Sequence, residues 1–105
     1  MAKFNEQVYE ILAQIPEGRV VSYGDIAKWL LRPRGAQVVG WAMANCPEYL
    51  PWHRVVRTDG DIAGGGYAEM RRERLVGEGI TFLPDGRVDM EKCRWVAPPG
   101  VDRRY

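Results

Sequence analysis

The most restrictive feature of this sequence is a pair of short helical segments separated by a tight break. The first begins at Ser22, which can cap a helix, and Asp25 three residues later can reach back to the Ser22 amide. Residues 32–35 contain proline and glycine and interrupt the pattern. A second helix, rich in Ala, Gly and Val, is expected over about 36–45. Two short helices joined by a turn with basic residues predict a helix-turn-helix.

The rest of the chain alternates between helical spacing and short extended runs. The other expected elements are a helix over 4–15, a hairpin with strands 55–57 and 62–63, a helix over 67–78, and a hairpin over 80–89. These elements predict an α+β fold: a single winged-helix-like domain with a helix-turn-helix and short β-hairpins. The domain is expected over residues 1–97, with residues 98–105 as a mobile C-terminal tail.

The composition is that of one small globular domain. The chain has 105 residues, of which 46% are hydrophobic and 28% charged. No apolar run approaches the roughly 20 residues of a membrane span, and the N-terminus lacks the apolar stretch of a signal peptide. Cys46 and Cys93 are too few and too far apart for a disulfide framework or a metal site. We therefore expect a cytoplasmic monomer without membrane association, metal or cofactor.

Positive charge is concentrated in one part of the chain. The formal net charge is only +1, but residues 19–57 contain six basic residues against two acidic ones. Arginine supplies 12 of the 15 basic residues, and its guanidinium group suits bidentate phosphate contacts. An ordinary solvated surface carries similar charge, so this observation alone leaves both interpretations open.

Three stretches in fixed order carry a family resemblance that spans roughly residues 4–95. They are 20–27 (VVSYGDIA), 39–43 (VGWAM) and 51–56 (PWHRVV). Together they resemble the O(6)-alkylguanine-DNA alkyltransferases, in which a cysteine between the proline and the histidine accepts the alkyl group. Trp52 stands at that position. An indole has no thiolate, so alkyl transfer to this residue is chemically excluded. The chain thus resembles the alkyltransferase-like branch, which binds alkylated guanine without repairing it.

The resemblance implies that the protein binds duplex DNA through the minor groove, flips the alkylated guanine and seats it against Trp52. It implies that Tyr23 helps to rotate the nucleotide outward and that residues 58–67 form a loop over the flipped base. Because this loop has glycine where some relatives have arginine or serine, we expect Gly65 and Gly66 to contact the lesion through main-chain amides. The expected DNA-contacting residues are Ser22, Tyr23, Arg34, Ala36, Gln37, Val38 and Asn45. The small residues of the second helix would allow close approach to the groove.

One departure from the family lies in the DNA-contacting set. Gln37 stands where the family usually has an arginine finger that fills the gap left by the flipped base. A glutamine can hydrogen-bond the orphaned base but lacks the charge and the stacking surface, and Arg34 is a candidate partial substitute. A polar residue on a solvated helix face is the alternative interpretation of Gln37. Trp41, in the middle of the same helix, is expected to pack into the core.

His53 and Glu78 match the family's proton-relay positions, but Trp52 leaves this relay nothing to activate. We therefore expect His53 to be a buried structural hydrogen-bonder. Arg54 is expected to hold the fold through carboxylate or carbonyl bonds. Both cysteines are expected to be passive.

The predicted function is a non-enzymatic damage sensor whose partners are double-stranded DNA carrying alkylated guanine and, by the resemblance, nucleotide excision repair proteins. One alternative is a winged-helix regulator that reads the major groove, although the presumed recognition helix is poor in the residues that read base edges. Another is a residual repair enzyme, for example an alkyltransferase acting through Cys46, although no metal-ligand cluster or carboxylate pair supports it.

Overall fold

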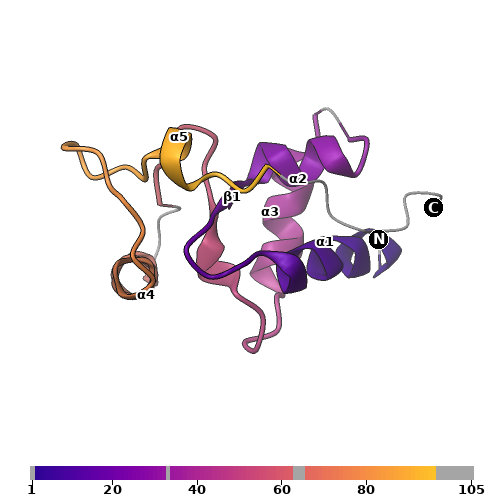
Figure 1. Cartoon of the computed structure of the whole chain (residues 1–105). Coiled ribbons are helices and arrows are strands. Elements are labelled where there is room, and N and C mark those ends of the chain that lie inside the picture. The colour runs from indigo at the N-terminus through magenta and orange to yellow at the C-terminus, as the bar shows by residue number, and fades with distance from the viewer. Residues whose placement is uncertain (1, 33, 63–65, 97–105) are drawn as a thin grey trace.

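The computed structural model describes residues 2–32, 34–62 and 66–96. In chain order the elements are α1 (Ala2–Gln14), β1 (Val21–Ser22), α2 (Tyr23–Trp29), α3 (Ala36–Ala44), the 3-10 helix η1 (Trp52–Arg54), β2 (Val55–Val56), α4 (Ala68–Gly77) and α5 (Met90–Cys93). Figure 1 shows α1, α2 and α3 grouped together, with α4 lying apart from that group. The α+β class and the helix pair predicted from the sequence are confirmed.

The first helix of the pair begins as the sequence predicts. The Asp25 amide donates to Ser22 Oγ at 2.9 Å, and the Ser22 amide donates to Asp25 Oδ2 at 3.0 Å, which completes a capping box. The turn before α3 requires glycine, because a Cβ built on Gly35 would lie 2.6 Å from the Arg32 Cβ and 2.9 Å from its carbonyl oxygen. Local sequence therefore fixes both the start of α2 and the entry to α3.

The two strands join two hydrophobic clusters. The first cluster consists mainly of side chains from α1, α2 and α3, and the second lies beneath α4 and α5. Val21 and Val55 pack into the first cluster, whereas their sequence neighbours Val20 and Val56 pack into the second. All four side chains are at most 1% exposed. The strand pair is therefore covered on both faces.

The prediction of a hairpin over 55–63 is wrong. The strand Val55–Val56 pairs in parallel with β1, with Val21 opposite Val55 and Ser22 opposite Val56. Both valines are buried, so their backbone needs a partner inside the core rather than on a solvent-facing hairpin. Residues 57–61 instead form a tight turn in which the Arg57 amide donates to the Asp61 carbonyl at 2.9 Å. Residue 63 lies outside the described residues.

The hairpin expected over 80–89 is reduced to one isolated antiparallel bridge between Phe82 and Val88. The short helix α5 follows and was not predicted, because only Asp89, which accepts a capping bond from the Lys92 amide at 3.4 Å, marks its start. Within the described ranges, none of the helices is both long enough and apolar enough to cross a bilayer. The tail expected over 98–105 falls outside the described residues.

Candidate nucleic-acid interface

Trp52 lies at the start of η1, half-buried and in contact with α4 rather than enclosed in the core. The guanidinium carbons of Arg71 and Arg74 lie 5.2 and 4.9 Å from the centroid of its ring. Tyr67 meets the indole edge-on, with the ring centroids 6.1 Å apart. Such cation–π and edge-to-face contacts hold an aromatic ring in a defined orientation.

The indole borders a cavity of about 360 Å³. The cavity is lined by Met43, Ala44, Cys46, Glu48, Trp52, Tyr67 and Arg71. Its volume falls within the range typical of small-molecule binding sites. The ring at position 52 therefore faces a space that can hold a planar guest.

Arg71 also brings hydrogen-bond donors to this cavity. Its Nε and Nη1 atoms are buried and have no hydrogen-bond partner among the described residues. A buried donor without an acceptor typically costs about 1–3 kcal/mol. The cavity therefore combines an aromatic wall with a guanidinium group whose hydrogen-bonding capacity is not fully used among the described residues.

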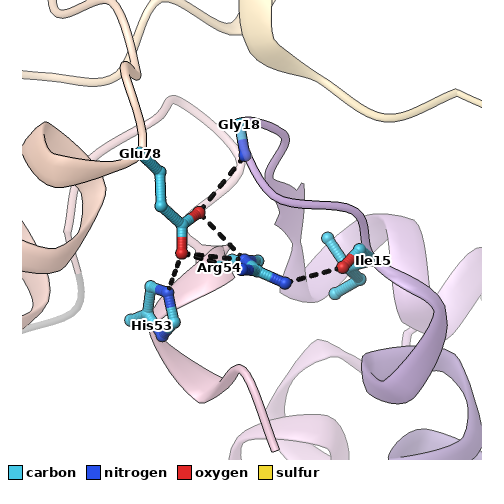
Figure 2. Close-up of polar contacts among 5 residues, drawn as sticks. All are labelled: Ile15, Gly18, His53, Arg54 and Glu78. Carbon is cyan, nitrogen blue, oxygen red and sulfur yellow. Dashed lines mark hydrogen bonds and ion pairs between the residues drawn. The ribbon is translucent and has the colours of Figure 1, made fainter.

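A buried polar network joins η1, the C-terminal end of α4 and the turn after α1 (Figure 2). His53 Nε2 lies 2.6 Å from Glu78 Oε2, while Arg54 Nε and Nη2 donate to the two Glu78 oxygens at 2.9 and 2.8 Å. Arg54 Nη1 donates to the Ile15 carbonyl at 2.8 Å, and the Gly18 amide donates to Glu78 at 3.3 Å. As expected from the sequence, His53 is a buried hydrogen-bonding residue and Arg54 binds both a carboxylate and a carbonyl group.

The network shifts the pKa of two of its members. Burial raises the pKa of Glu78, but hydrogen bonds from Arg54, His53 and the Gly18 amide outweigh it and lower that pKa to about 2. Burial lowers the pKa of His53 below its usual 6.5, against the opposing effect of Glu78. A neutral His53 donates through Nε2 to Glu78. Its Nδ1 is then a buried acceptor without a partner in the described part of the chain.

These shifts predict that acid destabilises the fold in two steps. As pH falls through 6.5, unfolded chains bind a proton at His53 before folded ones do, so the free energy of unfolding decreases. Below pH 4.5 the same holds for Glu78, whose contribution of roughly 3 kcal/mol is lost as pH falls toward 2. Urea unfolding at pH 7.5, 5.5 and about 3 measures both steps. In Glu78→Gln the second step should be much smaller, and a flat profile in the wild-type protein would contradict the prediction.

A second cavity, of about 480 Å³, lies beside the first half of α3. It is lined by Tyr23, Ala36, Gln37, Gly40, Trp41, Arg57 and Thr58. The structure therefore brings three of the predicted DNA-contacting residues, Tyr23, Ala36 and Gln37, to one concave surface. Arg57, which the sequence did not single out, joins them from the turn after β2.

The prediction that Trp41 packs into the core is wrong, because its side chain is 61% exposed. The buried residues of α3 are Val39 and Ala42, and Trp41 lies on the opposite face of the helix. Small apolar residues occupy both faces of α3, so helical spacing alone did not separate the inner from the outer face.

The structure places the other predicted contacts differently. Ser22 is fully buried, and its hydroxyl group caps α2, directly before Tyr23. The predicted contact between Ser22 and DNA is therefore wrong, because its side chain does not reach the surface. Arg34 and Val38 border a third concavity, away from the one that contains Gln37. Asn45 is exposed at the end of α3, and Gly66 is exposed before α4, whereas Gly65 lies outside the described residues.

Comparison with known proteins identifies the family. Residues 3–80 match the model for the 6-O-methylguanine DNA methyltransferase DNA-binding domain. The chain is 41% identical over 95 residues to the DNA base-flipping protein of Escherichia coli (strain K12), covering 88% of this chain and 74% of that protein. It is 34% identical over 106 residues to alkyltransferase-like protein 1 of Schizosaccharomyces pombe (strain 972), covering 90% and 96% of the two chains.

Solved structures show the same relationship. The crystal structure of S. pombe Atl1 in complex with damaged DNA containing O6-carboxymethylguanine matches with a TM-score of 0.81 and 29% identity, covering 92% of this chain and 98% of that one. The Mycobacterium tuberculosis OGT structure with DNA matches with a TM-score of 0.66 and 35% identity, covering 71% and 48%. The predicted resemblance to alkyltransferase-like proteins is thereby confirmed. This chain belongs to the 6-O-methylguanine DNA methyltransferase DNA-binding-domain family.

Proposed function

We propose that this protein is a non-enzymatic sensor that binds alkylated duplex DNA and holds a flipped O(6)-alkylguanine in the cavity beside Trp52. The observation that carries the proposal is the cavity itself. An indole forms its wall at the sequence position where the alkyltransferases have their reactive cysteine. Relatives named for base flipping, and a relative solved with O6-carboxymethylguanine DNA, support it.

The energetics of the cavity fit such a guest. Flipping a base out of the duplex costs a few kcal/mol, and less for a damaged base. Stacking on an aromatic side chain is worth about 1–3 kcal/mol per base, so the wall formed by Trp52 offsets much of that cost. The purine also carries acceptor atoms on its major-groove edge, and the guanidinium group of Arg71 at the cavity wall supplies positive charge for them. Each buried methylene of a larger adduct adds roughly 0.8 kcal/mol.

Tyr23 and Arg57 fit the duplex side of the same interface. The phenol and the guanidinium group line the cavity beside α3 and can donate to backbone phosphates. Phosphate contacts of this kind orient the protein on the duplex without reading its sequence. The proposal therefore assigns positioning to this cavity and lesion recognition to the cavity of Trp52.

A residual alkyltransferase acting through Cys46 is the second candidate, because Cys46 lines the same cavity as Trp52. The chemistry of the thiol is against it. Burial raises the pKa of Cys46, so little of the nucleophilic thiolate is present at neutral pH. The thiol also donates a weak hydrogen bond to the Pro47 carbonyl at 3.5 Å. His53, the chain's single histidine, is bound to Glu78 through Nε2.

The direct test is binding to paired oligonucleotides that differ only in one O(6)-methylguanine. By fluorescence anisotropy we expect the modified duplex to bind at least about 10-fold more tightly, a difference of about 1.4 kcal/mol that stacking on one ring can supply. Equal affinities would refute the proposal. Intact-mass measurement after incubation should show unmodified protein, and a transferred methyl group would establish the enzyme instead.

We further propose that the lesion complex recruits nucleotide excision repair proteins, because a receptor without chemistry of its own needs a partner that removes the damage. The resemblance to alkyltransferase-like proteins motivates this step. We also propose that the protein is monomeric and cytoplasmic. The free thiols of Cys46 and Cys93 agree with a reducing compartment. Lesion-dependent co-purification of repair proteins with the DNA-bound sensor tests the recruitment, with unmodified duplex as the control.

A further inference from the structure

We infer that Trp41 is a stacking wedge that inserts into the base stack at the site left by the flipped nucleotide. Its indole would supply the planar surface that the amide of Gln37 lacks. The inference rests on the proposed function and adds to it a residue that determines how firmly the duplex is held open. It commits to one occupant of the exposed face of α3, the minor groove of duplex DNA.

The position of α3 between the two cavities is the first argument. Residues in its first half, including Gln37 and Trp41, line the cavity of about 480 Å³ that contains Tyr23 and Arg57. Met43 and Ala44, in its second half, line the cavity of Trp52. The helix therefore borders both the cavity proposed to face the duplex and the cavity proposed to hold the lesion, and Trp41 lines the first of them.

The shape of the α3 surface is the second argument. Trp41 follows Gln37 by four residues, so the two side chains are neighbours on one face of the helix. Around them α3 presents small residues, and a Cβ built on Gly40 would meet no atom within 4 Å. The 61% exposed indole therefore projects from an otherwise low surface. Small residues that permit close approach, with an apolar wedge among them, are the combination that kinks DNA from the minor groove.

Charge is the third argument and favours nucleic acid as the occupant. None of the residues that line the cavity of Trp41 is acidic, and Arg57 lies at its edge. The Arg57 side chain is 59% exposed, and its ion pair with Asp61 is long, at 3.9 Å. Phosphate can compete for an exposed, weakly paired guanidinium group. An indole beside an exposed, weakly paired cation suits stacked bases flanked by phosphates.

The comparison of Gln37 with Trp41 gives the inference its chemical content. An arginine finger fills the gap in the base stack with a planar, charged group, whereas the amide of Gln37 is small and neutral. The indole of Trp41 supplies the larger planar surface one helical turn away. We therefore expect lesion affinity to depend on Trp41 more than on Gln37.

The test compares Trp41→Ala, Trp41→Phe and Gln37→Ala on duplexes with and without O(6)-methylguanine. Tyr49→Ala is the matched control, because Tyr49 is 85% exposed and lines neither cavity. We expect Trp41→Ala to weaken lesion binding about 10-fold, and unmodified duplex by much less. Trp41→Phe should retain most of the affinity, Gln37→Ala should lose less than Trp41→Ala, and Tyr49→Ala should match the wild-type protein.

A second readout follows the base stack itself. With 2-aminopurine placed next to the lesion, stacking of the Trp41 indole should keep its fluorescence low in the wild-type complex, and Trp41→Ala at saturating concentration should give a brighter complex. A lesion preference untouched by Trp41→Ala would overturn the inference while leaving the proposed function intact. Equal losses on both duplexes, or a change of oligomeric state on gel filtration, would also overturn it. Wild-type protein without lesion preference would overturn the proposed function and the inference together.

Discussion

Replacing Trp52 with alanine is expected to abolish most of the preference for duplex DNA that carries O(6)-alkylguanine. The substitution removes the aromatic wall of the cavity, worth about 1–3 kcal/mol per stacked base. It also releases Arg71 and Arg74, whose guanidinium groups lie over the ring, so the donors of Arg71 lose their fixed direction. Competition binding with modified and unmodified duplexes measures the ratio of affinities, which should fall by about 10-fold or more.

Two further variants make this prediction specific to the ring. Trp52→Phe keeps an aromatic wall with less area and should lose only part of the preference. Cys46→Ser changes another residue of the same cavity without removing the stacking surface and should leave the preference close to that of the wild-type protein. Far-ultraviolet circular dichroism should confirm that each variant is folded. If Trp52→Ala still discriminates as well as the wild-type protein, the lesion does not bind at this site.

Replacing Arg54 with alanine is expected to cost about 3–5 kcal/mol of folding free energy. Arg54 makes charge-assisted bonds to both oxygens of Glu78 and a third bond to the Ile15 carbonyl. Without it, Glu78 remains buried beside a neutral His53 and has lost the one cationic partner that it has among the described residues at neutral pH. A small domain has roughly 5–15 kcal/mol in total, so the variant should be close to unfolding at physiological temperature. Urea unfolding at pH 7.5 gives the difference.

Arg87→Ala is the matched control for Arg54→Ala. Arg87 also pairs with a carboxylate at 2.8 Å, but its partner Asp85 is 55% exposed, whereas Glu78 is only 11% exposed. Exposed ion pairs contribute about 0–1 kcal/mol, so this variant should unfold close to the wild-type midpoint. Arg54→Lys should recover little, because a single ammonium group cannot bridge two carboxylate oxygens and a carbonyl. Similar losses for Arg54→Ala and Arg87→Ala would contradict the prediction.

The parts of the site that depend on local chemistry could be predicted from the sequence. Ser22 and Asp25 lie three residues apart, which is sufficient for the capping box. Arg54 was expected to bind a carboxylate or a carbonyl group, and it binds both. The resemblance implies that Trp52 stands at the family's reactive position, and the structure adds the cavity beside it.

The parts that depend on packing between distant segments could not be predicted in this way. Arg71 and Arg74 reach Trp52 from a helix about twenty residues away, and only the docking of α4 on η1 makes that contact. The parallel pairing of β1 with β2 joins segments that no turn signal connects. The exposure of Trp41 could not be predicted because both faces of α3 are apolar in sequence, and only the packing of the helix shows which face is buried.

The valines of the strand pair have a consequence for how the protein responds to ligands. Val20 and Val56 belong to one hydrophobic cluster, and Val21 and Val55 belong to the other. Because these residues are neighbours in the chain, unfolding of either cluster would expose apolar side chains of the other. The chain should lose its structure in a single cooperative transition, and a guest held near Trp52 then raises the midpoint for every segment at once. At a free ligand concentration of 100 times Kd, the gain is about 2.7 kcal/mol. Thermal denaturation followed by any probe of the backbone thus reports whether the distant cavity is filled.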